Sequence, residues 1–414
     1  MIDKQLTHCG EPAAEESMRF FVNKITQGLT SELSHYDLRA LVLLGGYGKG
    51  EGGVIVIGRR CRPHNNIDLM LVVGDQERGS IAILQERVNR KAEYLERKLE
   101  IGIDISVITE SKLRSMPTRV LWYDMKEGHR TLYGDDSLVP SIPHDKRDIP
   151  SWDMRNLMVN RGSLLLISYL CFNRLNTRNQ THFKNKNTAI RRLIIKHTMK
   201  AIIGYGDALL YFGGTYHWSY KEKQQRIVSC LGASSRFKEM YSLAIRFRFS
   251  PDYSRYDDCN LETWHTEVSE VLSQVHLKCE SVRLQRADLD WGHYLETALS
   301  SLSVEQGLNV KSIGRCGLNV LSNHPGKLGS TSSVKTAMGY YTSNSQTLIP
   351  LLMPLIAYAY PGGDLDYKDN DFLCSHFGLK HFEYERVVCQ YLKSWGQNFD
   401  QNLWSVLKKH DLQL

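Results

Sequence analysis

The sequence lacks most of the motifs that identify common protein classes. Its nine cysteines include no C-x-x-C pair, so we expect free thiols in a reducing compartment instead of a disulfide framework or a zinc site. No H-E-x-x-H or G-x-S-x-G motif occurs, which argues against a zinc protease and a serine hydrolase. The longest apolar run, residues 347–360, is too short to span a bilayer and carries two prolines. No secretory pattern is visible near the start. We therefore expect a cytoplasmic protein that does not bind membranes.

The overall composition is ordinary, but the charge is unevenly distributed. The chain has 414 residues, of which 42% are hydrophobic and 23% charged, as in a soluble globular protein of two or three domains. The formal net charge is +7, and residues 151–250 contain 17 Lys and Arg against 4 Asp and Glu. A basic segment of this kind attracts phosphate, in a nucleotide or in a nucleic acid. A solvated basic helix surface would have the same composition.

Three short apolar segments near the start of the chain predict strands. Residues 38–46 are an aliphatic run that ends in two glycines, residues 66–74 form a second run, and residues 100–109 alternate apolar and polar side chains. Residues 16–36 and the charged segment 75–99 have helical spacing. The order helix, strand, strand, helix, strand predicts a small mixed sheet covered by helices.

Strand signals disappear beyond a stretch rich in Gly and Pro that ends near residue 150. Helical spacing follows, most clearly over residues 187–214. We predict an α+β protein with two domains, a mixed α/β domain over residues 1–148 and a basic, mostly helical domain over residues 149–414. Residues 306–346, rich in Gly, Ser and Asn, are expected to form a long irregular connection.

A glycine-rich segment, LVLLGGYGKGEGG at residues 41–53, overlaps the end of the first predicted strand. Glycines at this place let the backbone approach a phosphate closely, although the Walker G-K-[ST] ending is absent. Asp68 and Asp104 each lie between aliphatic residues on a later predicted strand. If those strands are neighbours, the two carboxylates converge beside the glycines and could hold Mg²⁺ together with a substrate phosphate. Each Asp could instead pair with an arginine or cap a loop.

The three segments together resemble the nucleotidyltransferase superfamily with the polymerase-beta type fold. Its pattern is an apolar run ending in Gly-Gly or Gly-Ser, then Asp-apolar-Asp on one strand and a third Asp on a later strand. The resemblance covers residues 38–135, including GHRTLYGDD near its end. It implies that Gly45 and Gly46 hold the triphosphate. Lys49, in the same segment, is a further candidate nucleotide contact. The resemblance also implies that Asp68 and Asp104 are catalytic carboxylates that bind Mg²⁺, for which Mn²⁺ could substitute.

The sequence departs from the family pattern at Asn66. The family has an Asp at this position, two residues before Asp68, whereas Asn66 offers a metal only a carbonyl oxygen without charge. At an effective dielectric of about 20, losing one carboxylate from a Mg²⁺ site forfeits several kcal/mol of raw attraction, of which desolvation offsets a part. We therefore do not expect a two-metal arrangement. Glu51 could supply the missing charge if its side chain points inward.

The basic helical segment supplies further candidate phosphate ligands. Arg192, Lys196 and Lys200 recur every four residues and so share one face of a helix. Related two-domain transferases hold the triphosphate with a basic residue of the helical domain, which favours Lys196 or Lys200 as nucleotide contacts. Tyr216 lies in the segment GTYHWSYKEK, whose aromatic rings could stack on a base or could anchor the core at a helix end.

The leading prediction is an enzyme that transfers a nucleoside monophosphate from a nucleoside triphosphate to a hydroxyl group and releases pyrophosphate. The acceptor is open, since a small molecule, a protein side chain and an RNA end all fit, and the base is not readable. Asn66 favours a second prediction, a catalytically weakened or inactive relative that binds nucleotide or a partner protein and regulates. A third is an RNA-binding protein that uses residues 151–250, with steeply salt-dependent affinity.

Overall fold

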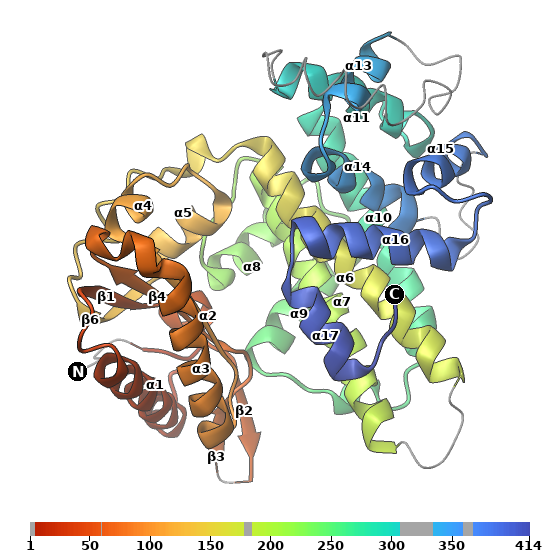
Figure 1. Ribbon diagram of the computed structural model, residues 1–414. Coiled ribbons are helices and arrows are strands. Elements are labelled where there is room, and N and C mark those ends of the chain that lie inside the picture. The colour runs from red at the N-terminus through yellow and green to blue at the C-terminus, as the bar shows by residue number, and fades with distance from the viewer. Residues whose placement is uncertain (1–4, 59, 178–183, 307–333, 359–366) are drawn as a thin grey trace. The chain divides into compact units, whose positions relative to one another are not determined.

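The computed structural model describes residues 5–58, 60–177, 184–306, 334–358 and 367–414 (Figure 1). The chain divides into two compact units. Unit 1 comprises Met1–Asp153, Thr215–Cys230 and Tyr241–Asp252, and unit 2 comprises the remainder. The predicted α+β class is confirmed, because a mixed sheet in unit 1 is followed by a mostly helical region.

The boundary between the units lies close to the predicted one but is not a single cut in the chain. Unit 1 continues five residues past position 148 and then takes in two later segments that we had predicted to belong to the helical domain. Local periodicity could not reveal this, because both segments are helical in sequence pattern. They belong to unit 1 through long-range contacts, which are described below with the candidate site.

Unit 1 is built on a four-stranded mixed sheet with the strand order β5-β4-β1-β6. Its strands are β1 (Leu38–Leu43), β4 (Ile67–Val73), β5 (Ile103–Thr109) and β6 (Arg130–Gly134). β1 is antiparallel to β4 and β6, whereas β4 and β5 are parallel. A parallel pair needs a long crossover connection, which α3 (Ile81–Leu99) provides. The three predicted strands are therefore present, and β6 is an edge strand that the sequence analysis did not predict.

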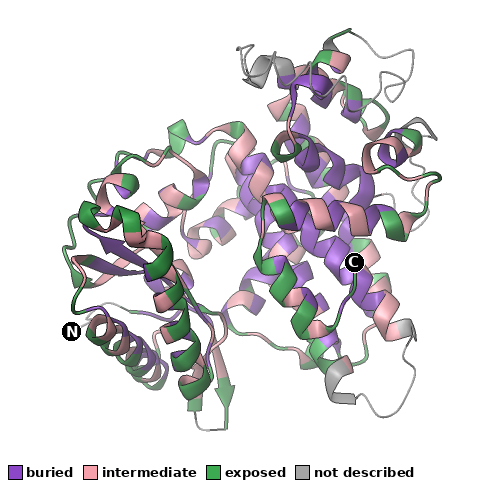
Figure 2. Ribbon diagram, in the orientation of Figure 1, coloured by how far each residue is buried: buried purple, intermediate pink, exposed green. Residues whose placement is uncertain are grey.

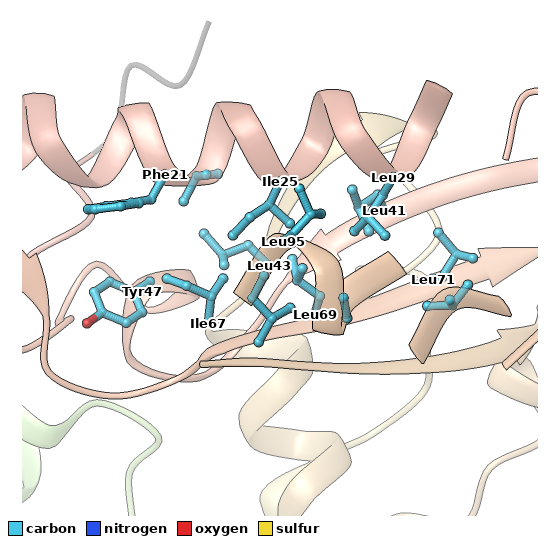
Figure 3. Close-up of a cluster of buried hydrophobic side chains, with 14 of the residues drawn as sticks. Phe21, Ile25, Leu29, Leu41, Leu43, Tyr47, Ile67, Leu69, Leu71 and Leu95 are labelled. Atoms are coloured by element: carbon cyan, nitrogen blue, oxygen red, sulfur yellow. The ribbon is translucent and has the colours of Figure 1, made fainter. Parts of the chain in front are cut away.

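The sheet separates two apolar clusters. The helices of unit 1 are α1 (Pro12–Glu32), α2 (Gly45–Gly48), α3, α4 (Glu110–Arg114), α5 (Val120–Glu127) and α8 (Tyr220–Ser229). Leu69 and Leu71 of β4 pack with α1 and α3 on one face (Figure 3). Met70 and Val72 pack with α4 and α5 on the other. Because side chains alternate along a strand, Asp68 belongs to the face of Met70 and Val72, at the beginning of β4.

The segment between the glycines and β4 forms a separate antiparallel pair, β2 (Val54–Ile57) and β3 (Arg60–Pro63). Ser17 of α1 donates its hydroxyl to the carbonyl oxygen of Cys61 at 2.6 Å, which fixes β3 to the rest of unit 1. The central strands β1 and β4 of the main sheet are largely buried, whereas β5 and β6 are partly exposed, and much of α3 is exposed (Figure 2). The centre of the main sheet therefore lies inside unit 1, and the beginnings of β4 and β5 carry the candidate site.

The described residues of unit 2 form helices joined by loops and turns. Its helices are α6 (Ser151–Thr177), α7 (Lys184–Phe212), α10 (Leu261–Arg283), α11 (Trp291–Gln306), α13 (Val334–Thr342), α14 (Ser345–Ala357), α15 (Tyr367–Phe377), α16 (Tyr384–Asn398) and α17 (Asn402–His410). α9 (Ser235–Phe249) begins in unit 2 and ends in unit 1. None of the described helices is both long and apolar enough to cross a lipid bilayer.

The predicted irregular connection over residues 306–346 is wrong for its last part. Residues 334–342 form α13, in which Tyr340 and Tyr341 are buried. Asn344 then caps α14 by accepting a hydrogen bond from the N–H of Thr347. Burial of these aromatic side chains stabilises a helix that the Ser- and Gly-rich composition did not suggest. Residues 307–333 lie outside the described part of the chain.

Candidate functional site

Asp68 and Asp104 lie side by side at the beginning of the parallel strands β4 and β5. They are direct partners in the register of this pair. Adjacent strands are about 4.8 Å apart, and paired residues point their side chains to the same face. Asp68 is half-buried and Asp104 is exposed to solvent. The predicted convergence of the two carboxylates is confirmed.

The glycine segment bends directly against Asp68. Gly45 has a φ of 61°, a left-handed conformation that side-chain-bearing residues rarely adopt. A Cβ at Gly45 would lie 2.1 Å from Oδ2 of Asp68. The N–H of Leu44 donates to the Asp68 carbonyl oxygen at 2.8 Å, which connects the bend to β4. Only glycine therefore fits at position 45, because the backbone φ is positive and because the Asp68 carboxylate occupies the space that a Cβ would need.

Replacing Gly45 with Ala is expected to lower the free energy of unfolding of unit 1 by about 2 kcal/mol or more. Left-handed backbone alone costs a side-chain-bearing residue on the order of 1–3 kcal/mol, and the added methyl would also displace the Asp68 carboxylate. Gly46→Ala is the matched control, because its Cβ would meet no atom closer than 3.4 Å. Urea unfolding of both variants measures the difference. Equal stability of the two would contradict the geometry of the bend.

Asn66 does not act as the oxygen donor that we predicted for a metal. Its side-chain Nδ2 donates to Oδ2 of Asp104 at 2.8 Å, and a carboxylate can only accept, so the amide nitrogen must face it. The amide oxygen lies on the other side, against Gly102. Asn66 therefore holds the Asp104 carboxylate in place, which is a positioning role.

Glu51 does not supply the missing charge. Its carboxylate is buried and accepts hydrogen bonds from the hydroxyl of Ser219 and, at 2.7 Å, from the N–H of Tyr220. Ser219 is the N-cap of α8 and Tyr220 is its first residue. The N–H groups at this end of a helix favour a negative charge. The suggestion that Glu51 completes a metal site is corrected on this ground. Glu51 instead connects the glycine segment to α8.

The side chains of Lys49 and Tyr216 also form hydrogen bonds within unit 1. The Lys49 ammonium lies 2.8 Å from Oδ2 of Asp124 and donates to the Trp218 carbonyl oxygen at 2.7 Å, with its side chain 5% exposed. The Tyr216 hydroxyl donates to the other oxygen of Asp124 at 2.7 Å. Tyr216 is buried, so it is the core anchor of our alternative prediction and not a platform for a base. Asp124, which the sequence analysis did not single out, joins both residues.

Tyr47 anchors the middle of the glycine segment. Its ring is buried, and its hydroxyl donates to the Gly53 carbonyl oxygen at 2.7 Å. Burial raises the pKa of the Tyr47 hydroxyl far above its usual value. The hydroxyl therefore stays protonated and keeps donating this bond across the physiological pH range. The bend that carries Gly45 is held rigidly from within.

Arg248, near the end of α9, is the residue at this bend that sequence reasoning missed. Its guanidinium carbon lies 4.0 Å from the centre of the Tyr220 ring. Its Nη2 lies 3.5 Å from the position that a Cβ of Gly46 would occupy. Nothing in the local pattern of α9 marks this arginine, because it reaches the bend only through the long-range packing of α9 in unit 1.

Lys196 and Lys200 lie on α7 in unit 2, where both side chains are half-buried. The arginine that precedes them on the same face, Arg192, lies 5.3 Å from the centre of the Tyr253 ring. The expectation that Lys196 or Lys200 contacts the triphosphate stays a prediction. Asp68, Asp104 and the glycine bend, in contrast, all belong to unit 1.

The chemistry available at the site is that of two adjacent carboxylates beside a glycine bend. No group of three or more His, Cys, Asp and Glu side chains suited to a metal ion is found among the described residues. Two carboxylates nevertheless fit Mg²⁺, which commonly takes one or two protein carboxylates and completes its shell with phosphate oxygens and water. No family model matches this chain, and no curated protein matches it. The geometry of the residues themselves therefore carries the functional argument.

Proposed function

We propose that this protein is a nucleotidyltransferase that moves a nucleoside monophosphate from a nucleoside triphosphate to a hydroxyl group. The observation that carries the proposal is the pairing of Asp68 with Asp104 across β4 and β5, with the Asp68 carboxylate against Gly45. Carboxylates and a close-approaching glycine backbone are the two elements needed to hold a divalent cation and a polyphosphate together. The resemblance of residues 38–135 to the nucleotidyltransferase superfamily supports the same reaction.

Each residue has a defined role in this reaction. Asp68 and Asp104 would hold one Mg²⁺, or Mn²⁺, which when bound neutralises charge on the phosphate oxygens. Gly45 and Gly46 begin a helical turn, and the first N–H groups of such a turn have no intrahelical acceptor, so they are suited to donate to phosphate oxygens. Asn66 keeps the Asp104 carboxylate oriented through its 2.8 Å hydrogen bond. Positioning and charge neutralisation are what phosphoryl chemistry chiefly requires.

The bonds of the transfer balance without a further reactant. The acceptor hydroxyl oxygen forms a bond to the α-phosphorus, while the bond from that phosphorus to the oxygen bridging to the β-phosphate breaks. Pyrophosphate leaves with the bonding electrons, and the hydroxyl proton passes to solvent or to the exposed carboxylate of Asp104. The acceptor itself, whether small molecule, protein side chain or RNA end, is not identified by the residues of this site.

The test begins with binding and continues with turnover. The purified chain is melted with Mg²⁺ and each of the four nucleoside triphosphates in turn. A ligand at about 100 times its Kd adds about 2.7 kcal/mol, which corresponds to several degrees of melting temperature. Release of pyrophosphate is then followed with cell extract as the source of acceptors. The proposal predicts both a shift and release, and the absence of a shift with every triphosphate would contradict it.

A nucleotide-binding or regulatory protein without turnover is the second candidate, and Asn66 is the observation that favours it. Asn66 replaces a carboxylate with a hydrogen-bond donor to Asp104, so the site has less negative charge than the family pattern implies. Asn66→Asp separates the two candidates. An enzyme gains divalent-cation affinity and changes its rate of pyrophosphate release, whereas a regulator binds nucleotide and releases no pyrophosphate in either form.

A further inference from the structure

Arg248 is fixed in orientation beside the glycine bend. Its guanidinium lies over the Tyr220 ring at 4.0 Å, and the backbone carbonyl of the same residue lies 2.2 Å from where a Cβ of Gly53 would be. The end of α9 is thus packed closely on the segment that follows the bend. Stacking on an aromatic ring holds the plane of a guanidinium and leaves its N–H edge available for hydrogen bonds.

One donor of Arg248 is not used within the described residues. Its Nε is buried and has no hydrogen-bond partner there. Glu51 is already engaged by the N-terminus of α8, and Asp124 by Lys49 and Tyr216. Asp68 lies at the same bend, against Gly45. A buried donor without a partner costs about 1–3 kcal/mol. Such a cost is tolerated where a ligand removes it.

Two further cations lie close to Arg248, at the same aromatic ring. Besides Arg248, the ammonium groups of Lys49 and Lys223 lie 4.7 and 5.1 Å from the centre of the same Tyr220 ring. Three cations therefore surround one aromatic ring beside the bend. Asp124 pairs with Lys49, and Glu51 accepts from the Tyr220 N–H, so this positive charge is partly balanced. The Arg248 guanidinium beside the glycine backbone can still attract an oxyanion.

We propose that Arg248 binds the phosphate chain of the nucleotide at the glycine bend. This inference rests on the proposed function and assigns the phosphate-binding cation to α9, in the same unit as Asp68 and Asp104, in place of Lys196 or Lys200. The Nε and Nη2 edge of a guanidinium donates two parallel hydrogen bonds to a phosphate. A lysine at this position would supply charge but could not both stack on Tyr220 and donate in pairs.

Inorganic tripolyphosphate tests this site without requiring transfer to an acceptor. Its affinity is measured by calorimetry in the presence of Mg²⁺ for the wild-type chain, Arg248→Gln, Arg248→Lys and Arg246→Gln. Arg246 is an exposed arginine two residues earlier on α9 and is the matched control. We expect losses of about 10- to 100-fold for Arg248→Gln, a smaller but clear loss for Arg248→Lys, and no change for Arg246→Gln.

The outcomes separate this inference from the proposed function. Equal affinity of the Arg248 and Arg246 variants, or no tripolyphosphate binding by the wild-type chain, overturns the assignment of Arg248. If that happens while pyrophosphate is still released from triphosphates, the transferase proposal stands without Arg248. Tripolyphosphate binding that depends on Arg248, without pyrophosphate release from any triphosphate, supports the phosphate site and contradicts the transferase proposal. Circular dichroism shows whether Arg248→Gln folds. If it does not fold, the affinity of Arg248→Lys tests the assignment instead, because this variant retains the charge and most of the aliphatic side chain.

Discussion

Replacing Asp104 with Asn is expected to lower pyrophosphate release by at least about 100-fold, which corresponds to about 2.7 kcal/mol of transition-state stabilisation. Asp104 and its strand partner Asp68 are the two carboxylates assigned to the cation. At 4 Å and an effective dielectric of about 20, two unit charges interact by about 4 kcal/mol, and the loss is larger for a divalent cation. The same variant is expected to lose the melting-temperature shift that Mg²⁺ and a triphosphate produce.

The unliganded stability of Asp104→Asn should stay within about 0.5 kcal/mol of wild type, because Asp104 is exposed. Asp136→Asn is the matched control, since it makes the same change at another exposed position. Activity of Asp104→Asn at the level of Asp136→Asn would show that the carboxylate pair is not part of the reaction. A variant that loses activity through unfolding is recognised by its lowered melting temperature without ligand.

Replacing Glu51 with Ala is expected to lower the free energy of unfolding of unit 1 by about 3 kcal/mol. The Glu51 carboxylate accepts from the Ser219 hydroxyl and the Tyr220 N–H in a buried environment. Its removal leaves both donors without that acceptor at the N-terminus of α8, and α8 carries the Tyr220 ring on which Arg248 stacks. For a unit of this size the loss corresponds to roughly 10 °C in melting temperature.

Two further substitutions define the cause of this loss. Glu51→Gln keeps an oxygen acceptor but not the charge, so its loss should be smaller than that of Glu51→Ala. Glu127→Ala removes an exposed carboxylate of unit 1 and should change stability by about 0.5 kcal/mol or less. Denaturant unfolding, followed by the change in aromatic fluorescence, gives the three values. If Glu51→Ala proved as stable as Glu127→Ala, the carboxylate would not secure α8.

The sequence was sufficient for those features that depend on local pattern. The apolar alternation around Asp68 and Asp104 predicted two strands with both carboxylates facing the same way, and these strands are direct neighbours. The glycines after β1 predicted a bend in the chain. Gly45 has the positive φ that glycine adopts readily in such a bend. The helical character of residues 187–214 was also confirmed, with α7 ending at Phe212 before two glycines.

Features set by contacts between distant residues could not be predicted. Glu51 and Ser219 are far apart in the chain. Nothing in the sequence near Glu51 therefore indicated that its carboxylate would accept hydrogen bonds at the N-terminus of α8. Lys49 was predicted to contact a nucleotide, but Asp124 and Trp218 accept hydrogen bonds from its ammonium group. The same reason explains why β6, a short edge strand, was missed. Its pairing with β1 is not visible in its own composition.

The central claim is that Asp68 and Asp104 jointly hold a divalent cation with a polyphosphate beside Gly45. The most direct measurement is electron paramagnetic resonance of Mn²⁺ titrated into the chain with a non-hydrolysable nucleoside triphosphate. The paired carboxylates predict one bound Mn²⁺ per wild-type chain and none, at the same concentrations, in Asp104→Asn. Equal Mn²⁺ binding by both proteins, or none by the wild-type chain, would contradict the claim.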